Sequence, residues 1–93
     1  MKVNVLYGDE YIDIIEIPDD NMDIESVHYE FVRWVQREDS EYKIGEGDRA
    51  VFSYGIDVFI DWLNENYFKT GNKAKVLIRS TQKYNKKDVS IGF

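Results

Sequence analysis

The stretch KVNVLYGDEYIDIIEI, residues 2–17, decides the fold class of this chain. Its first part alternates apolar Val3 and Val5 with polar neighbours, and this spacing of two is typical of a half-buried strand. A Gly-Asp turn follows, and then the β-branched run from Tyr11 to Ile17. Two such runs around a short turn predict a β-hairpin. Because a lone hairpin is only marginally stable, the chain needs more strands in the same sheet.

The second run of this hairpin changes its alternation. Ile12 and Ile14 share one face of the expected strand, whereas Ile15 and Ile17 share the other. Either a β-bulge resets the pattern, or both faces of this strand are partly covered. Pro18 is expected to end the strand, since proline has no backbone N–H to donate.

An amphipathic segment after this strand predicts the first helix. Carboxylates at 19–23 favour a helix N-terminus, and apolar residues then recur at helical spacing from Ile24 to about Glu38. Tyr29 lies on the polar side of this helical wheel.

A second amphipathic segment predicts another helix after a short strand and turn at 40–47. Ser53 is the expected N-cap, with Asp48 as an earlier alternative. The residues expected to face the core are Ile56, Phe59, Ile60, Leu63 and Tyr67, with Val58 and Trp62 extending the stripe. Gly71 is expected to close this element.

The last part of the chain predicts two more strands joined as a second hairpin. Residues 74–79 alternate, so Lys75 and Arg79 should share one solvent-facing side of a strand. A polar loop at 82–88 leads to the alternating run 89–93, which we expect to be tied into the sheet.

These elements give the order β-β-α-(β)-α-β-β in a single domain, residues 1–93. Hairpins at both ends with helices between them favour the α+β class, with an antiparallel or mixed sheet and two helices packed on one face.

Charge is segregated along the chain, whose formal net charge is −6. Residues 1–65 carry 5 Lys/Arg and 17 Asp/Glu, a balance of −12. Residues 66–93 carry 7 Lys/Arg and 1 Asp/Glu, a balance of +6. Segregation of this kind points to binding partners more than to the fold.

An acidic stripe is predicted on the second helix. Asp57, Asp61 and Glu65 recur every four residues, opposite the apolar arc. Like charges at that spacing cost an isolated helix about 0.2–0.5 kcal/mol per pair. We expect the stripe either to be solvated or neutralised by Lys75 and Arg79, or to face a basic partner.

In the partner interpretation, an aromatic residue beside acidic surface, Trp62 or Tyr29, would supply the buried anchor of the interface.

The basic residues of the C-terminal part also have two interpretations. The candidates are Lys75, Arg79, Lys83, Tyr84, Lys86 and Lys87. Lysines with one aromatic ring have the composition of a small contact to phosphate or to a nucleic-acid single strand. The simpler interpretation, which we favour, is protection of a sheet edge and compensation of nearby carboxylates, because a −6 protein repels nucleic acid.

No motif predicts catalysis, and no cofactor or metal is expected. His28, the only histidine, falls inside the apolar arc of its helix and is expected to be a packed residue. The GEGDR stretch at 45–49 lacks the lysine and spacing of a phosphate-binding loop, and DDNMD at 19–23 lacks the glycine and glutamate of a calcium loop. Asp9, Glu10 and Asp13 could form a carboxylate pair for acid–base chemistry, but nothing marks any of them as buried, so we expect a solvated face. Without cysteine there is no thiolate site.

The function expected from these features is that of a non-enzymatic, cytoplasmic protein-binding module without a membrane role. In its most concrete form it is a small acidic inhibitor of a basic or nucleic-acid-processing protein, of the immunity-protein or phage anti-defence kind. The alternative is a nucleic-acid-binding accessory protein that uses the basic C-terminal hairpin. A small enzyme or enzyme subunit is the third class, and the residues support it least.

Overall fold

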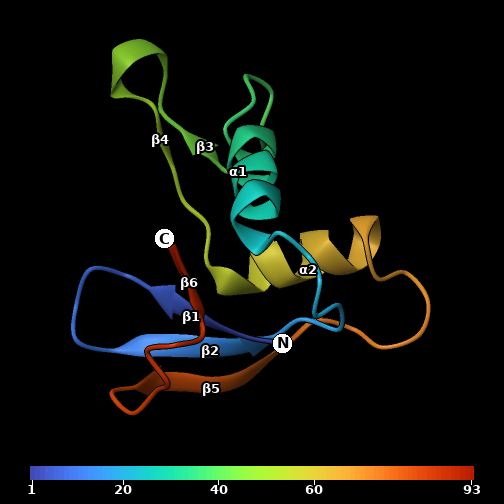
Figure 1. Ribbon diagram of the computed structural model, residues 1–93. Helices are drawn as coiled ribbons and strands as arrows, with labels where there is room; N and C mark the ends of the chain where they lie inside the picture. Colours follow the sequence, from blue (N-terminus) through green and yellow to red (C-terminus); the bar gives the residue numbers. More distant parts are fainter.

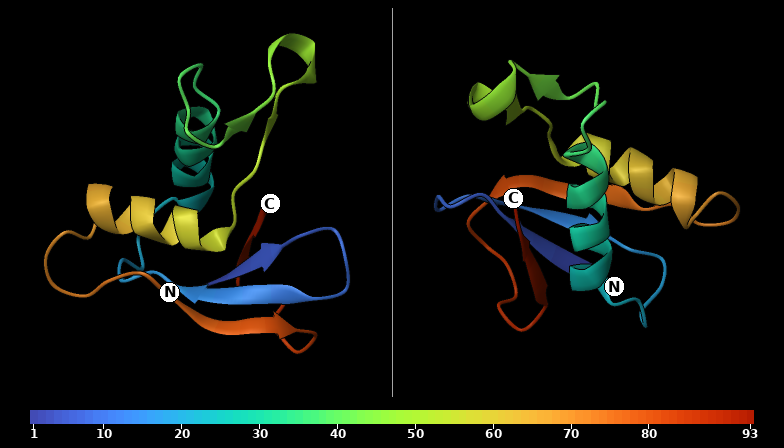
Figure 2. Two further views of the ribbon diagram at one scale, coloured as in Figure 1. Left: turned by 180° about the vertical axis from the view of Figure 1, so that it is seen from behind. Right: turned by 90° about the horizontal axis from the view of Figure 1, so that it is seen from above.

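The computed structural model describes all residues from 1 to 93 and confirms the α+β class (Figure 1). Two α-helices lie on one face of a four-stranded mixed sheet, and a small two-stranded arm projects from the body (Figures 1 and 2). The elements in chain order are β1 (Lys2–Leu6), β2 (Ile12–Glu16), α1 (Ile24–Val35), β3 (Lys43–Ile44), the 3₁₀ turn η1 (Gly47–Arg49), β4 (Val51–Phe52), α2 (Ile56–Asn66), β5 (Lys75–Thr81) and β6 (Val89–Gly92).

The N-terminal hairpin is the centre of the sheet, whose strand order is β5-β2-β1-β6. β1 and β2 pair antiparallel in unbroken register, with Val3 opposite Ile15. β2 pairs antiparallel with β5, and β1 pairs parallel with β6. The predicted hairpin is therefore confirmed, and the sheet is mixed. The altered phase of β2 reflects coverage of both of its faces, since Ile12, Ile14 and Ile15 are all buried.

The prediction that the last two strands form a second hairpin is wrong. β5 and β6 occupy opposite edges of the sheet and are separated by β2 and β1. Residues 82–88, here called the crossover segment, carry the chain from one edge to the other across the face without helices (Figure 2). The side-chain amide of Asn4, on that face of β1, donates to the backbone oxygen of Asn85 at 2.9 Å. Asn4 is 0% exposed, which places the crossover segment directly over the middle of the sheet.

Two register shifts interrupt the pairing of β5 with β2. Ile15 faces Val76 and Ile14 faces Ile78, so Leu77 is an extra residue on β5. A second shift follows towards Thr81, and Ser80 within it has a φ of 54°. Each bulge adds one residue to one strand and reverses the direction of the side chains beyond it.

The helices cover the side of the sheet that carries Val3 and Ile15. Their core-facing residues join both strands in one cluster, in which the Phe31 ring of α1 lies 4.9 Å from the Phe59 ring of α2. α1 begins at the predicted place, where Asp23 accepts hydrogen bonds from the backbone N–H and hydroxyl of Ser26. It ends at Val35, three residues before the expected end.

α2 begins later than predicted. Its N-cap is Gly55, which provides no side-chain hydrogen bond, so Ser53 and Asp48 do not cap it. Val51 and Phe52 instead form β4, which pairs antiparallel with β3. The predicted short strand at 40–47 is confirmed as β3.

The β3–β4 arm stands away from the sheet (Figures 1 and 2). Ile44 and Val51 face each other across its two strands, and each is 58% exposed. η1 forms the tip of the arm and buries none of its residues. Neither α1 nor α2 has the length and apolar character that a membrane-crossing helix requires.

Candidate protein interface

α2 presents the predicted acidic residues as one exposed row. Its core side buries Ile56, Phe59 and Leu63, and the helical period then directs positions 57, 61 and 65 away from the core. Asp57, Asp61 and Glu65 are all exposed, and they are called the acidic ridge below. Consecutive members are separated by about 6 Å along the helix axis, since each residue adds 1.5 Å.

Only one end of the acidic ridge is neutralised. The guanidinium of Arg79 on β5 contacts a carboxylate oxygen of Asp57 at 2.7 Å. The hydrogen bond to Asp57 and the charge of its carboxylate raise the pKa of Arg79. Both side chains are largely exposed, so this pair contributes little to stability. Asp61 and Glu65 have no ion pair within 4.0 Å.

The acidic surface extends from α2 onto the segment after α1. Tyr42 packs its ring 6.0 Å from that of Trp34. Burial raises the pKa of Tyr42, and the carboxylates of Glu41 and Asp61 raise it further. Carboxylates from two elements therefore act on one phenol, while the guanidinium of Arg37 lowers the same pKa.

Trp62 extends the apolar stripe of α2, as predicted, and it is not accessible as the anchor of an interface. Only 7% of it is exposed, because α1 covers the side of α2 on which it lies. Its ring is 5.5 Å from Phe31 and 6.5 Å from Trp34. Trp62 is therefore a core residue.

Tyr29 is 66% exposed, but it does not lie beside the acidic ridge. Phe31 and Trp34 are the α1 residues that contact Trp62, and Tyr29 falls on the opposite side of the α1 wheel from them. The α1 residue that reaches the C-terminal end of α2 is Glu30, whose carboxylate accepts a hydrogen bond from Tyr67 at 2.8 Å. Tyr29 and the ridge thus form separate surfaces.

Lys75 and Arg79 were predicted to share one face of β5, and this prediction is wrong. Lys75 pairs with Glu16 on the face of the sheet without helices, whereas Arg79 reaches Asp57 on the helix side. The extra residue at Leu77 reverses the alternation between them. Of the two residues expected to neutralise the acidic ridge, Arg79 forms an ion pair with it and Lys75 does not.

The other basic candidates lie together on the crossover segment. Lys83, Lys86 and Lys87 are exposed, and Tyr84 is half-buried. They therefore project from the face of the sheet opposite to α2 and its acidic ridge.

His28 is packed among aromatic rings. Its ring stacks on Phe93 at 5.0 Å and meets the edge of Phe59 at 5.4 Å. Its Nε2 atom is buried without a hydrogen-bond partner. Burial lowers the pKa of His28, which favours the neutral imidazole.

The other acidic candidates have structural roles. Asp19 accepts a hydrogen bond from the backbone N–H of Asn21, and Asp23 caps α1. No group of three or more histidine or carboxylate side chains is arranged to hold a metal ion.

The expectation that Asp13 is solvated is wrong, and the network that holds it was missed by the sequence reasoning. Asp13 is 8% exposed and accepts hydrogen bonds from the hydroxyl of Tyr7 at 2.7 Å and the backbone N–H of Ser80 at 2.9 Å. Burial raises the pKa of Tyr7, and the hydrogen bond to Asp13 raises it further. Both oxygens of Asp13 are occupied, so the carboxylate fixes the second bulge of β5. The φ of Ser80 leaves no signal in its sequence neighbourhood.

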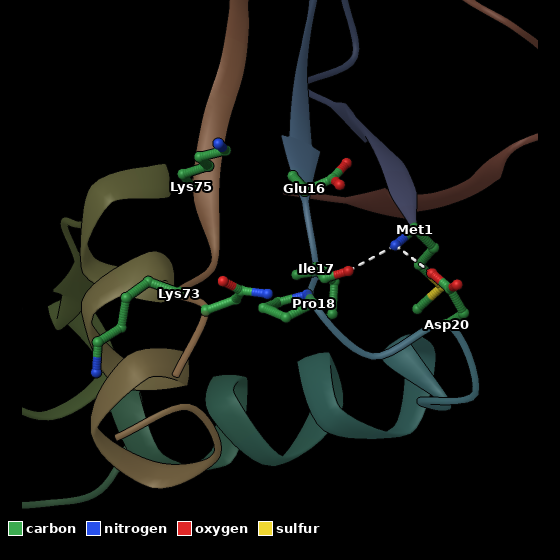
Figure 3. Close-up of a pocket in the computed structure, with 8 residues that line it drawn as sticks. Met1, Glu16, Ile17, Pro18, Asp20, Lys73 and Lys75 are labelled. Carbon is green, nitrogen blue, oxygen red and sulfur yellow. Dashed lines mark hydrogen bonds and ion pairs between the residues drawn. The ribbon is translucent and has the colours of Figure 1, made fainter. Parts of the chain in front are cut away.

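A polar cleft of ≈ 440 Å³ lies between the end of β2 and the start of β5 (Figure 3). Its walls are Met1, Glu16, Ile17, Pro18, Asp20, Asn72, Lys73 and Lys75. The Met1 amine is bound to Asp20 and to the backbone oxygen of Ile17. The Lys73 ammonium is turned out of the cleft towards the end of α2, where it donates to the backbone oxygens of Phe68 and Lys69. Met1, Asp20 and Lys73 are thus satisfied within the chain, whereas the side chains of Glu16 and Lys75 take part in no ion pair.

Comparison with known proteins gives no relative: no protein-family model, curated protein or solved structure matches this chain.

Proposed function

We propose that this chain is a non-enzymatic protein-binding module that engages a basic surface of another protein through the acidic ridge. The observation that carries the proposal is the state of Asp61 and Glu65. They are exposed on a rigid helix, and neither has an ion pair. Two like charges at this spacing work against the helix, so local stability does not explain them.

The carboxylates near the ridge support the same proposal. Glu41 and Asp61 both raise the pKa of Tyr42 against the opposing charge of Arg37, so carboxylates of two elements lie where a partner would approach α2. Such a field accelerates encounter with a basic protein and disfavours acidic ones. The anchor of the interface would come from an exposed apolar group rather than from Trp62, and the Ile44–Val51 pair of the arm is one such group.

The most specific form of the proposal is an inhibitor that covers a basic site, of the immunity-protein or phage anti-defence kind. As part of the same proposal, we place its action in the cytoplasm. The inhibitor form of the proposal rests on the small size of the chain and on its charge segregation.

Affinity capture with matched baits tests the proposal. Wild-type chain should recover a basic protein from the native host lysate, and the Asp61→Lys/Glu65→Lys variant should lose it. The control bait, Lys83→Ala/Lys86→Ala, changes charge on the opposite face and should retain the same protein. If the ridge variant recovers the protein and the control bait loses it, the interface lies on the face of the crossover segment and the proposal is wrong.

A further inference from the structure

Neither carboxylate compensation nor edge protection, the two simpler explanations given above, accounts for the three lysines of the crossover segment. Lys83, Lys86 and Lys87 take part in none of the ion pairs of the structure, so they do not compensate carboxylates. They also do not protect a sheet edge, because the crossover segment runs over the sheet face and the edges are β5 and β6. Three unpaired ammonium groups within five residues repel one another, so an anion that binds them gains from all three.

The backbone of the crossover segment is held in place. Asn85 accepts from Asn4 through its backbone oxygen and from the backbone N–H of Lys87 through its side chain. The hydroxyl of Thr81 accepts from the backbone N–H of Lys83. The backbone that carries the lysines is therefore ordered before binding, which lowers the entropic cost of binding.

The surroundings of the crossover segment add charge and apolar surface. Lys2 and Lys75 flank Glu16 in one row of the same sheet face. Ile78 pairs with Ile14 on that face and is 47% exposed. Tyr84 is half-buried, so part of its ring is accessible. Carboxylates are near as well, since Glu10 accepts a hydrogen bond from Gln82 at 2.8 Å.

We propose that this face binds single-stranded nucleic acid through its phosphates. Lysine ammonium groups contact phosphates as point charges, and Tyr84 and Ile78 offer surface to unstacked bases. A double helix is less suitable, because a sheet face with short lysine-bearing turns presents no element that fills a groove. The site lies on the opposite face of the sheet from α2, so it is independent of the proposed function.

The expected affinity is modest because the chain carries a net charge of −6 and Glu10 lies beside the site. With about three phosphates neutralised, the logarithm of the binding constant should fall with a slope of about −2 against the logarithm of salt concentration. Binding should thus be in the micromolar range at about 50 mM salt and roughly 20-fold weaker at about 200 mM.

Fluorescence anisotropy with a labelled single-stranded DNA of about 12 nucleotides measures this directly, at a length set by the site size of small single-strand binders. The Lys83→Ala/Lys86→Ala/Lys87→Ala variant should bind at least about tenfold more weakly and lose most of the salt slope. The control, Lys43→Ala/Arg49→Ala/Lys69→Ala, removes the same charge from side chains without a hydrogen bond or ion pair. It should bind as the wild type does, and urea unfolding should show that both variants fold.

Three results would overturn the proposal. The first is no binding of the oligonucleotide by wild-type chain at low salt. The second is an equal loss in both variants, which would mean that net charge alone controls binding. The third is competition by polyglutamate as effective as that by unlabelled oligonucleotide, which would assign the face to an acidic protein. None of these results bears on the acidic ridge, because its capture experiment is decided by Asp61 and Glu65 and uses Lys83 and Lys86 only as a control.

Discussion

Ser80 shows how a single residue can carry the strain of a bulge. Its φ of 54° lies in the left-handed region, where a side chain costs about 1–2 kcal/mol. The buried carboxylate of Asp13 stabilises this conformation by accepting a hydrogen bond from the backbone N–H of Ser80. Neither residue could be identified from the sequence, because the hydrogen bond joins positions 13 and 80 on different strands.

Ser80→Gly should therefore stabilise the fold. Glycine removes about 1–2 kcal/mol of strain but costs about 0.5–1 kcal/mol through the greater chain entropy of the unfolded state, so the net gain should be at most about 1.5 kcal/mol. Urea unfolding measures it. The matched control is Ser90→Gly, at a residue of β6 without a positive φ, which should destabilise the chain. A loss of equal size in both variants would mean that Ser80 is not strained.

His28 should make stability depend on pH. Its pKa is lowered by burial in the folded chain, so below the ordinary value of about 6.5 the unfolded chain binds more protons. The free energy of unfolding should consequently fall as pH falls from about 7 to 5.5, a window that lies above carboxylate titration and below that of the amino terminus.

His28→Leu should abolish most of this dependence, because leucine fills the aromatic pocket and removes the unpaired Nε2 atom. Urea unfolding at several pH values provides the comparison. An unchanged slope in the variant would assign the dependence to other groups.

At the scale of elements, local patterns predicted most of the fold. The Gly-Asp turn and its flanking runs gave the hairpin, and apolar periodicity gave both helices, because these signals depend on neighbours within one element. The path of the chain after β5 could not be predicted, because a seven-residue polar segment can close a hairpin or cross a sheet. The observed path involves residues far from the segment in sequence, namely the β1 residues that pair with β6 and the Asn4 amide that binds Asn85.

The candidate site was predicted in part for the same reason. The acidic ridge follows from the helical period alone, and its exposure is as expected. Trp62 lies at the border of the apolar arc, and its burial depends on Phe31 and Trp34 of another helix. The separation of Lys75 from Arg79 depends on an extra residue in β5, which alternation alone does not reveal.

The start of α2 lacks a side-chain cap, and a substitution should supply one. Gly55 has extended backbone angles that any residue adopts, and a Cβ there would meet nothing within 4 Å. Gly55→Ser should stabilise the chain by about 0.5–1 kcal/mol through a cap hydrogen bond and a less flexible unfolded state. Gly8→Ser, at a φ of 85°, should instead destabilise it. Thermal unfolding of both variants decides this, and a gain at Gly8 would contradict the assigned angles.

At the scale of the whole molecule, the charge segregation of the sequence becomes a separation between two faces. The acidic ridge lies with α2 on one side of the sheet, and the unpaired lysines lie with the crossover segment on the other. Neither surface contributes to the core, so reversing either charge should leave the fold intact. For Asp61→Lys/Glu65→Lys we expect the free energy of unfolding to change by at most about 0.5 kcal/mol.

The role of the acidic ridge is tested most directly by the association rate constant with the captured basic protein, measured against ionic strength. Wild-type chain should associate at least about tenfold faster at low than at physiological salt, because charge steers the encounter. Asp61→Lys/Glu65→Lys should lose this acceleration, and Lys83→Ala/Lys86→Ala should keep it. Equal rates and equal salt dependence for the wild type and the ridge variant would contradict the assignment of the interface to α2.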